Sequence, residues 1–244
     1  MVKNVCVIIQ ARMNSERLSG KVMRKIGGVP VVGILLDRLK QTRLPIVLAT
    51  STNEENDPLA EYVSSRGVAV YRGSEDNVLE RYYIVARDAK ADVVVRLTGD
   101  NPLIDRELLC NCVKEYIERE DGRAYISTGL SKTYPLGMSI EVFGFELLSE
   151  AYRNAKHSSE YEHVTPYMHQ NIPGDIHIVK PDMGISKYHY RMTIDTVEDF
   201  EFARVLIEDY RCNELCLDEI IKVIDAHPEL ISINKGSLQK NWDD

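Results

Sequence analysis

Residues 5–21 read VCVIIQARMNSERLSGK, an apolar run followed directly by a polar loop with three cations. Residues 5–9 form a continuous apolar run that is typical of a core strand. Arg12, Arg17 and Lys21 follow on a stretch with Ser and Gly, in which backbone N–H groups remain free. A loop of this kind at the C-terminal end of a strand suits a polyphosphate ligand.

The charge of this region contrasts with that of the chain. Residues 1–28 carry six Lys and Arg residues and one Glu, a local charge of +5, whereas the whole chain carries −8. Positive charge gathered on one loop of an acidic protein indicates a local anionic ligand. A Walker A loop is excluded because Val22 follows Lys21, and no G-x-G-x-x-G occurs. We expect the loop to face solvent, and a merely solvated basic turn remains the alternative.

Size and composition are those of one large soluble domain, with 244 residues, 44% hydrophobic and 28% charged. The acidic balance argues against a nucleic-acid partner, and no apolar run is long enough to predict a membrane span. The five cysteines are an odd number, which fits a reducing cytoplasm, so we expect a cytoplasmic protein. The pairs Cys110/Cys112 and Cys212/Cys216 leave a zinc site as an alternative, but their spacings favour buried thiols.

Apolar runs alternate with helical patterns through the first half of the chain. Strands are predicted at 4–9, 45–50, 68–71 and 92–97, and helices at 29–41, 54–65, 76–89 and 105–119. This alternation is typical of an α/β fold with a mostly parallel sheet. Ligands of such sheets bind beyond the carboxyl ends of the strands. Thr52 with Glu55 predicts a capping box for the second helix, and Asp105 predicts an N-cap for the fourth.

The regularity falls after residue 120. Strands are predicted at 123–128, 139–145, 176–179 and 190–194, with a loop at 129–138 and a helical stretch at 145–170. Thr196 begins a helix with Asp199 at the capping-box position, and a last helix runs from Asp218 to about His227. We therefore predict a single domain over 1–244 whose middle third departs from the regular alternation.

Two aspartates follow apolar strand candidates at the predicted ligand end of the sheet. Asp100 lies in the sequence Gly99-Asp100-Asn101-Pro102, and Asp195 lies in Asp195-Thr196. Two carboxylates that face a cationic loop predict a site for a divalent ion bound to a polyphosphate. The alternatives are a turn residue for Asp100 and helix-dipole stabilisation for Asp195.

Together these motifs resemble those of a known family. The patterns are Ala11-Arg12-x-x-Ser15-x-Arg17-Leu18-x-Gly20-Lys21, then Gly99-Asp100-x-Pro102, then Asp195-Thr196-x-Glu198-Asp199. They resemble the CTP-dependent sugar cytidylyltransferases, the group that activates 3-deoxy-manno-octulosonate and acylneuraminates. The Gln10-Ala11-Arg12 opening and the segments 73–82 and 162–167 look more like the spore coat polysaccharide biosynthesis protein F branch.

The resemblance implies a three-layer, mostly parallel Rossmann-like sheet of the nucleotide-diphospho-sugar transferase type. It implies a nucleotide-binding half at 1–105 and a sugar-binding and dimer-forming part at about 120–190. The residues implied to bind CTP are Ala11, Arg12, Ser15, Arg17, Lys21, Arg72, Ser74, Asn77 and Thr98. Those implied to bind the sugar are Tyr134, Gly137, Glu141, Glu162 and His163. Asp100 and Asp195 are implied to hold Mg²⁺ or Mn²⁺, and together with Arg12 and Lys21 they form the implied catalytic set.

Some positions depart from the octulosonate enzymes. Gln10 and Ser19 stand where those enzymes have Pro, and Thr98 stands where they have Gln. The residue at 98 therefore bears on base contacts and on the identity of the sugar. Glu141 is also open to interpretation as a charge at a strand edge, and His163 as a hydrogen-bonded helix residue.

The expected function is transfer of CMP from CTP to a hydroxyl of an acidic sugar, with release of pyrophosphate, for surface or spore polysaccharide. The resemblance also implies a homodimer. One alternative is a glycosyltransferase that uses a nucleotide-sugar, although the Asp-x-Asp triplet of such enzymes is absent from the chain. The other is a nucleotide-binding homologue that has lost catalysis.

Overall fold

The computed structural model describes residues 3–170, 177–180, 182 and 184–238, and its first half alternates strand and helix as predicted. The parallel strands are β1 (Val5–Gln10), β4 (Ile46–Ser51), β5 (Ala69–Gly73) and β6 (Val93–Thr98). The helices between and after them are α1 (Val31–Lys40), α2 (Asp57–Ser65), α3 (Val78–Asp88) and α4 (Arg106–Arg119). All eight predicted elements are confirmed, with shifts of a few residues at their ends.

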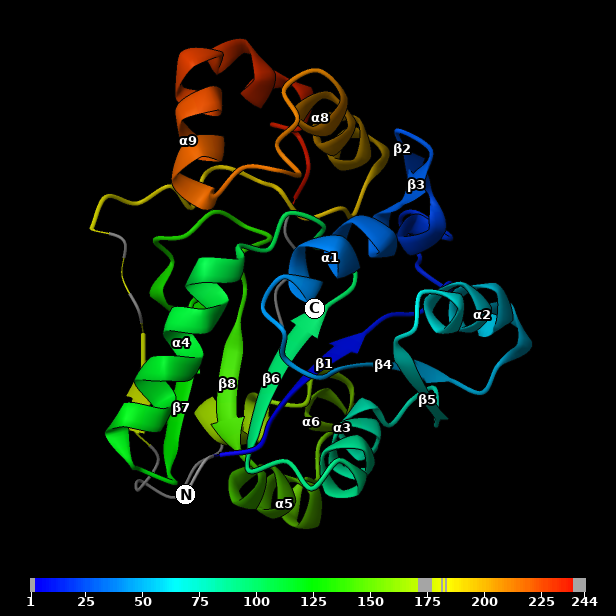
Figure 1. Cartoon of the computed structure of the whole chain (residues 1–244), viewed down its shortest axis with the longest axis vertical. Helices are drawn as coiled ribbons and strands as arrows, with labels where there is room; N and C mark the ends of the chain where they lie inside the picture. Colours follow the sequence, from blue (N-terminus) through cyan, green and yellow to red (C-terminus); the bar gives the residue numbers. More distant parts are fainter. Residues whose placement is uncertain (1–2, 171–176, 181, 183, 239–244) are drawn as a thin grey trace.

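The described part of the second half adds three strands to the sheet, of which β8 runs antiparallel to the others. β8 (Glu141–Gly144) pairs antiparallel with β6, β7 (Ala124–Ser127) pairs antiparallel with β8, and β9 (His177–Val179) pairs parallel with β7. The resulting order is β5-β4-β1-β6-β8-β7-β9 (Figure 1). The predicted helical stretch at 145–170 is divided into α5 (Phe145–Asn154), α6 (Ser158–His163) and α7 (Pro166–His169).

The strand predicted at 190–194 is wrong. This segment makes only an isolated bridge, between Leu136 and Arg191. That bridge consists of two hydrogen bonds, from the amide of Leu136 to the carbonyl of Tyr190 and from the amide of Met192 to the carbonyl of Leu136. The amide of Ile194 donates instead to the carbonyl of Asp100, beyond the end of β6. The segment is apolar because its side chains pack into a core outside the sheet, so its hydrophobicity resembles that of a strand.

Helix starts were predicted with mixed success. The Asp105 carboxylate accepts from the amide of Leu108 at 2.7 Å, and the Thr196–Asp199 capping box begins α8 (Val197–Glu208). The box predicted at Thr52 and Glu55 is absent, because a 3-10 turn at Glu54–Asn56 precedes α2 without side-chain capping.

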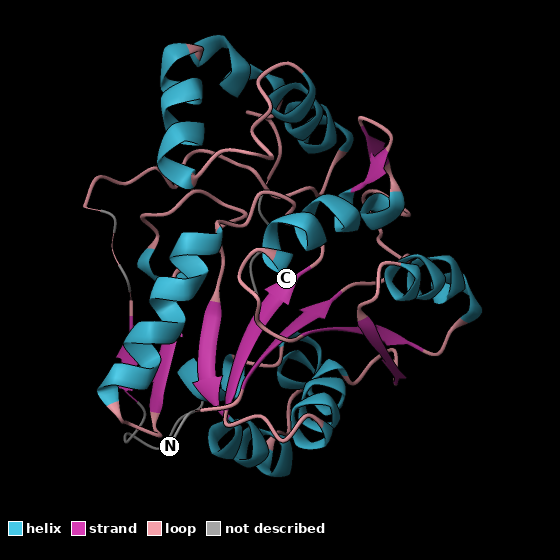
Figure 2. Ribbon diagram, in the orientation of Figure 1, coloured by secondary structure: helices cyan, strands magenta, loops and turns pink. Residues whose placement is uncertain are grey.

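The sheet is sandwiched between two helix layers (Figure 1, Figure 2). Val7 and Ile9 pack with residues of α1, α2 and α4, whereas Cys6 and Ile8 pack with residues of α3 and α5. The strand therefore presents apolar side chains to both faces, which explains the continuous hydrophobicity at 5–9. The three-layer α/β fold predicted from the sequence is confirmed.

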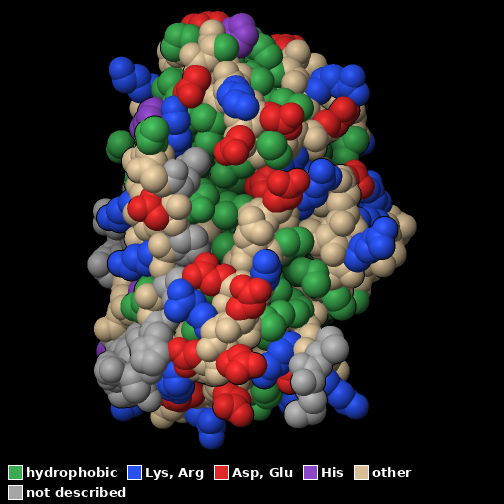
Figure 3. Space-filling model, turned by 60° about the vertical axis from the view of Figure 1, so that its left-hand side comes forward, with side chains coloured by type: hydrophobic (Ala, Val, Ile, Leu, Met, Phe, Trp, Pro, Cys, Tyr) green, Lys and Arg blue, Asp and Glu red, His purple; other side chains and the backbone are tan. Residues whose placement is uncertain are grey.

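A third core lies beyond the sheet, at the top of Figure 1. It joins α8, α9 (Leu217–Ala226) and the small ribbon of β2 (Lys25–Ile26) and β3 (Val29–Pro30) to the segment at 190–194. Acidic and basic side chains are interspersed over the face drawn in Figure 3. Within the described residues, none of the helices has both the length and the apolarity to cross a membrane.

Candidate active site

The loop after β1 is held in place by backbone hydrogen bonds. The amide of Met13 donates to the side chain of Asn56 at 2.8 Å, and the amide of Gly20 donates back to the carbonyl of Met13 at 2.8 Å. Gly20 adopts a φ of 66°, which favours glycine, and so the chain can reverse there into the turn that carries Lys21. Ala11 is buried at the start of the loop, and Ser15 is half-buried.

Lys21 lies at the centre of the site. Its Nζ is 2.6 Å from Oδ2 of Asp100 and 2.8 Å from Oδ1 of Asp195. Only 11% of its side chain is exposed, so the expectation that this part of the loop faces solvent is wrong for Lys21. Arg17 joins the same cluster, with NH2 3.1 Å from Oδ1 of Asp195. The structure thus brings together four of the residues predicted from three separate motifs.

Asp195 is positioned by a backbone hydrogen bond of the residue before it, and not by membership of a strand. The amide of Ile194 donates to the carbonyl of Asp100 at 3.0 Å, which places the two aspartates side by side although 95 positions separate them in sequence. Asp100 itself follows β6, and its Oδ1 accepts from the hydroxyl of Thr98 at 2.7 Å. Both carboxylates are therefore presented on rigid supports.

Gly99 allows the β6 end to approach the loop after β1. Its amide donates to the carbonyl of Gln10 at 2.8 Å, and a Cβ at this position would lie 2.7 Å from the Cβ of Ala11. Carbon atoms do not approach that closely without displacement, so only glycine fits here. The close approach brings Asp100 within reach of Lys21.

The charges in this cluster stabilise one another. Burial lowers the pKa of Lys21, but the charges of Asp100 and Asp195 outweigh that effect and raise its pKa overall. Burial likewise raises the pKa of Asp195, but Lys21, Arg17 and Arg191 outweigh it and hold the pKa below its ordinary value. Each group thus stays charged through its partners rather than through solvent.

Arg12 points away from this cluster, toward a neighbouring pocket. Its guanidinium is 3.2 Å from Glu75 and 3.6 Å from Glu162. A pocket of about 400 Å³ is lined by Arg12, Glu75, Asp76, Asn77, Ser158, Tyr161 and Glu162. Asn77 and Glu162, predicted for the nucleotide and for the sugar respectively, therefore share one cavity.

The 72–77 segment is fixed by hydrogen bonds within itself and to neighbouring elements. The guanidinium of Arg72 donates to the carbonyls of Ser51 and Asn53 at 3.0 Å and pairs with Asp57 at 2.6 Å. Asn77 caps α3 by accepting from the amide of Glu80, and its own amide donates to the hydroxyl of Ser74. Arg72 is thus bound to the loop after β4 and to α2, whereas Ser74 and Asn77 form the turn beside Arg12.

Glu141 lies inside the sheet. β8 is flanked by β6 and β7, so the interpretation of Glu141 as a strand-edge charge is wrong. Its carboxylate is bound by Arg96, Tyr125 and Thr165, and only 3% of the residue is exposed. Burial raises the pKa of Glu141, but Arg96 and the two hydroxyl donors outweigh it and lower the pKa overall.

The other residues predicted for the sugar are divided between two places. His163 ends α6, where burial lowers its pKa and the charges of Glu162 and Arg96 also act on it. Tyr134 packs against the third core, near α8 and α9. Gly137 has a φ of 101°, and a Cβ there would lie 2.6 Å from the amide of Thr193, so this glycine permits contact with the 190–194 segment. Tyr134 and Gly137 thus accompany the Asp195 segment, whereas His163 accompanies Glu162.

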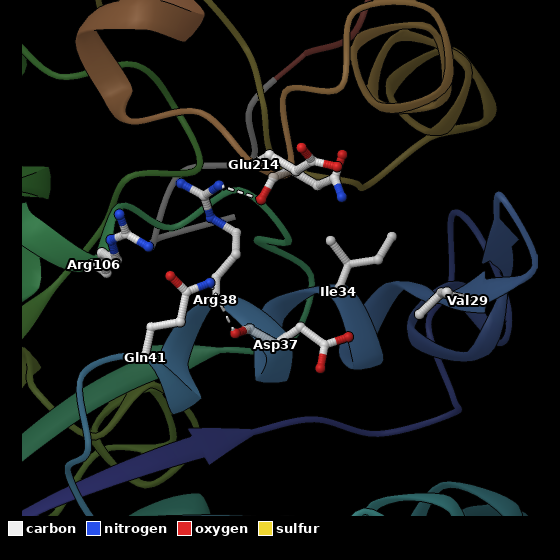
Figure 4. A pocket seen from close by; sticks show the side chains of 8 residues that line it. Val29, Ile34, Asp37, Arg38, Gln41, Arg106 and Glu214 are labelled. Atoms are coloured by element: carbon white, nitrogen blue, oxygen red, sulfur yellow. Dashed lines mark hydrogen bonds between the residues drawn. The ribbon is translucent and has the colours of Figure 1, made fainter.

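A second pocket, of about 280 Å³, lies elsewhere and contains none of the predicted residues (Figure 4). It is lined by Val29, Ile34, Asp37, Arg38, Gln41, Arg106, Asn213 and Glu214. Arg38 is buried and donates to the carbonyls of Ile104, Asn213 and Leu215, so it joins α1 to the loop before α9.

Three charged residues that contact the predicted site residues were not predicted from the sequence: Glu75, Arg96 and Arg191. Arg96 and Arg191 each interrupt an apolar run, and a charge inside such a run is a usable signal of a buried partner. Glu75 gave no such signal, because it lies in a polar turn.

The donor groups present at the site limit which metal ions it can bind. Within the described part of the chain, no His, Cys, Asp and Glu residues form a group of three or more suited to a metal, and the five cysteines are unpaired thiols. The zinc alternative is therefore not supported. Asp100 and Asp195 already share one cationic partner, and their carboxylate oxygens are ligands of the type that Mg²⁺ takes.

Comparison with known proteins gives consistent results. A sequence model of the family described as Cytidylyltransferase matches residues 6–237. The spore coat polysaccharide biosynthesis protein SpsF of Bacillus subtilis is 34% identical, over 93% of this chain and 97% of its own. The structure of a cytidylyltransferase from Leptospira borgpetersenii has a TM-score of 0.89 at 30% identity, over 98% of this chain and 100% of that one. The structure of CMP:2-keto-3-deoxy-manno-octonic acid synthetase complexed with CTP shares the fold, with a TM-score of 0.64 at 16% identity over 84% and 99% of the two chains.

Proposed function

The chain belongs to the cytidylyltransferase family and is a nucleotidyltransferase; on that premise we propose that it transfers CMP from CTP to a hydroxyl group of an acidic sugar. The acidic sugar and a role in surface or spore polysaccharide are suggested by what the names of relatives say of those proteins. The cationic loop, the paired aspartates and the pocket beside Arg12 supply a place for each part of the reaction.

The observation that carries the proposal is the position of Lys21 between Asp100 and Asp195. In the free protein, carboxylates pair with the cations of this loop. When CTP binds, its triphosphate can replace these carboxylates as the partner of the cations. Lys21 and Arg17 would then neutralise the phosphate oxygens, and Arg12 would leave Glu75 to join them. Charge-assisted contacts of this kind are stronger than neutral hydrogen bonds, most of all at Lys21, whose side chain is 11% exposed.

A divalent cation fits the carboxylate pair that Lys21 would release. Asp100 and Asp195 would hold Mg²⁺ or Mn²⁺, which when bound would withdraw electron density from the α-phosphate. The chain's own contribution is to hold the two carboxylates together and to keep Lys21 and Arg17 near the phosphates. The proposed sites therefore combine charge neutralisation with positioning.

The reaction is a substitution at phosphorus. The sugar hydroxyl oxygen forms a bond to the α-phosphorus, the bond from that phosphorus to the bridging oxygen breaks, and pyrophosphate leaves with the electron pair. The hydroxyl proton passes to solvent or to a phosphate oxygen. We assign no side chain as general base.

The two parts of the chain would divide the substrates between them. We assign the nucleotide to the half at 1–105, with Ser74 and Asn77 beside the base and ribose. The sugar would occupy the side formed by residues 120–190, with Glu162 lining the pocket, His163 next to it at the end of α6, and Glu141 buried within the sheet. We also propose that this part forms a homodimer, which light scattering at micromolar concentration tests directly.

Pyrophosphate release tests the function. Purified protein with Mg²⁺ is screened with CTP, UTP, GTP and ATP against acidic sugars and their neutral analogues. The expected result is pyrophosphate and a CMP-sugar with CTP and an acidic sugar only. Release with neutral sugars alone would reject the acidic substrate, and nucleotide release from a nucleotide-sugar without pyrophosphate would indicate a glycosyltransferase. The absence of turnover with every pair would support a homologue that has lost catalysis.

A further inference from the structure

We propose that Arg191 is a positioning residue that orients the carboxylate of Asp195, an inference that rests on the proposed function. Arg191 is buried, with 6% of its surface exposed, and it lies in the apolar segment that precedes Asp195. Its NH2 group donates to Oδ2 of Asp195 at 2.7 Å. The same side chain donates from Nε to Oδ1 of Asp199 at 2.8 Å.

The two oxygens of Asp195 have separate partners. Oδ2 is bound by Arg191, whereas Oδ1 is bound by Lys21 at 2.8 Å and by Arg17 at 3.1 Å. A carboxylate that is held by one oxygen cannot rotate freely about its side-chain bonds. Arg191 therefore keeps Oδ1 directed at the cations of the loop, which is where the substrate phosphates and a metal ion would be.

Arg191 is itself fixed from behind. Asp199, with 1% of its surface exposed, accepts from Arg191 and from the backbone amides of Asp195 and Thr196 at 3.1 Å. Asn234 donates to Oδ1 of Asp199 at 3.0 Å and to the carbonyl of Arg191 at 2.9 Å. The chain of contacts runs from the C-terminal segment through Asp199 and Arg191 to Asp195.

The role requires the shape of arginine as well as its charge. Two different nitrogen atoms of one planar group bind two carboxylates, and the ammonium group of lysine lacks this fixed fork. Arg191→Lys therefore keeps the charge and loosens the orientation. Residues that orient a ligand of a metal typically change affinity or activity ten- to a hundredfold when they are replaced.

Arg38→Lys is the matched control. Arg38 is an arginine of similar burial that binds backbone carbonyls and pairs with the buried carboxylate of Asp105, and it does not contact Asp195. Both variants should lose similar thermal stability, so any difference between them in catalysis comes from the site. We expect Arg191→Lys to lower kcat about ten- to a hundredfold with little change in the KM for CTP, and Arg38→Lys to change neither.

A second measurement does not depend on turnover. Mn²⁺ binding is followed by electron paramagnetic resonance in a Lys21→Met background, in which the ammonium group of Lys21 no longer competes for the carboxylates. Adding Arg191→Lys should weaken Mn²⁺ binding about tenfold or more, and adding Arg38→Lys should not. If Arg191→Lys does not fold, Asp199→Asn loosens the same arginine from behind and should reproduce both effects.

The outcomes separate the two claims. Wild-type turnover and Mn²⁺ affinity in Arg191→Lys, or equal losses in Arg38→Lys, would overturn the role of Arg191 and leave the proposed function standing. If the wild-type protein releases no pyrophosphate and the Lys21→Met variant binds no Mn²⁺, the proposed function is overturned, and the inference with it.

Discussion

Replacing Lys21 by Met tests whether one pair of carboxylates serves both an internal cation and a metal ion. The substitution removes the ammonium group and keeps most of the apolar stem. Two contacts are lost, to Asp100 and to Asp195, in a side chain that is 11% exposed. Asp195 retains Arg17 and Arg191, and Asp100 retains the hydroxyl of Thr98.

The magnitude follows from these contacts. A hydrogen bond to a charged group contributes about 1.5–3 kcal/mol, and because the carboxylates keep other partners we expect a net loss of about 3 kcal/mol in the free energy of unfolding. For a chain of this length that loss lowers Tm by roughly 6–12 °C. Mg²⁺ should then occupy the vacated carboxylates and restore about 2.7 kcal/mol at a hundred times its Kd.

The assay is thermal unfolding with and without Mg²⁺, in the absence of CTP. Wild-type protein should gain less from Mg²⁺ than Lys21→Met does, because its ammonium group competes for the same oxygens. Lys187→Met is the control. Nζ of Lys187 lies 2.8 Å from the carboxylate of Asp225, a residue of α9, and removing this ammonium group should not make the protein's thermal stability depend on Mg²⁺. Equal stabilisation of wild type and Lys21→Met by Mg²⁺ would refute the shared site.

Three further predictions concern the same region. Asp100→Asn and Asp195→Asn should each lower turnover by orders of magnitude, and the double variant should be little worse than either, since both carboxylates serve one site. Pyrophosphate release measures the turnover, and a wild-type rate in either single variant counts against the shared site. Gly99→Ala should destabilise the protein by about 1–3 kcal/mol and reduce turnover as well, because its Cβ would lie 2.7 Å from that of Ala11; denaturant unfolding of Gly99→Ala at wild-type stability would contradict this close packing. The pKa of Asp195 is lowered in the folded state, so its charge stabilises the protein above the pKa of aspartate in the unfolded chain, near 4. That stabilisation is lost as the pH falls through the folded-state pKa, so between about pH 2 and 6 the free energy of unfolding should depend less steeply on pH in Asp195→Asn than in wild type. Identical pH dependence in the two proteins would argue against the ion pairs.

The sheet and the first loop were accessible from the sequence because their signals are local. A strand buried on both faces needs consecutive apolar residues, and a helix on its face needs apolar residues at a period of 3.6, so β1, β4, β5, β6 and the helices between them were predicted. Asp100 was placed correctly for the same reason, since it directly follows a strand. The resemblance drawn from three short motifs is confirmed by a family match to residues 6–237.

The segment at 190–194 marks the limit of that reasoning. Its apolar pattern is satisfied equally by a strand in the sheet or by packing into a separate core, and the sequence does not distinguish the two. Glu141 shows the same limit in the sheet, because whether β8 is an edge strand depends on whether β7, an earlier segment of the chain, pairs beside it.

Local sequence determined which side chains are charged and which backbone elements carry them, because propensity and periodicity act over a few residues. Only the tertiary structure decided which charges meet. Lys21, Asp100 and Asp195 lie 79 and 95 positions apart along the chain, and they are joined by one hydrogen bond from the amide of Ile194 and by the close approach at Gly99. A charge in a loop has the same local pattern whether it faces water or an opposite charge, and the difference arises only when distant segments pack and exclude the water between them.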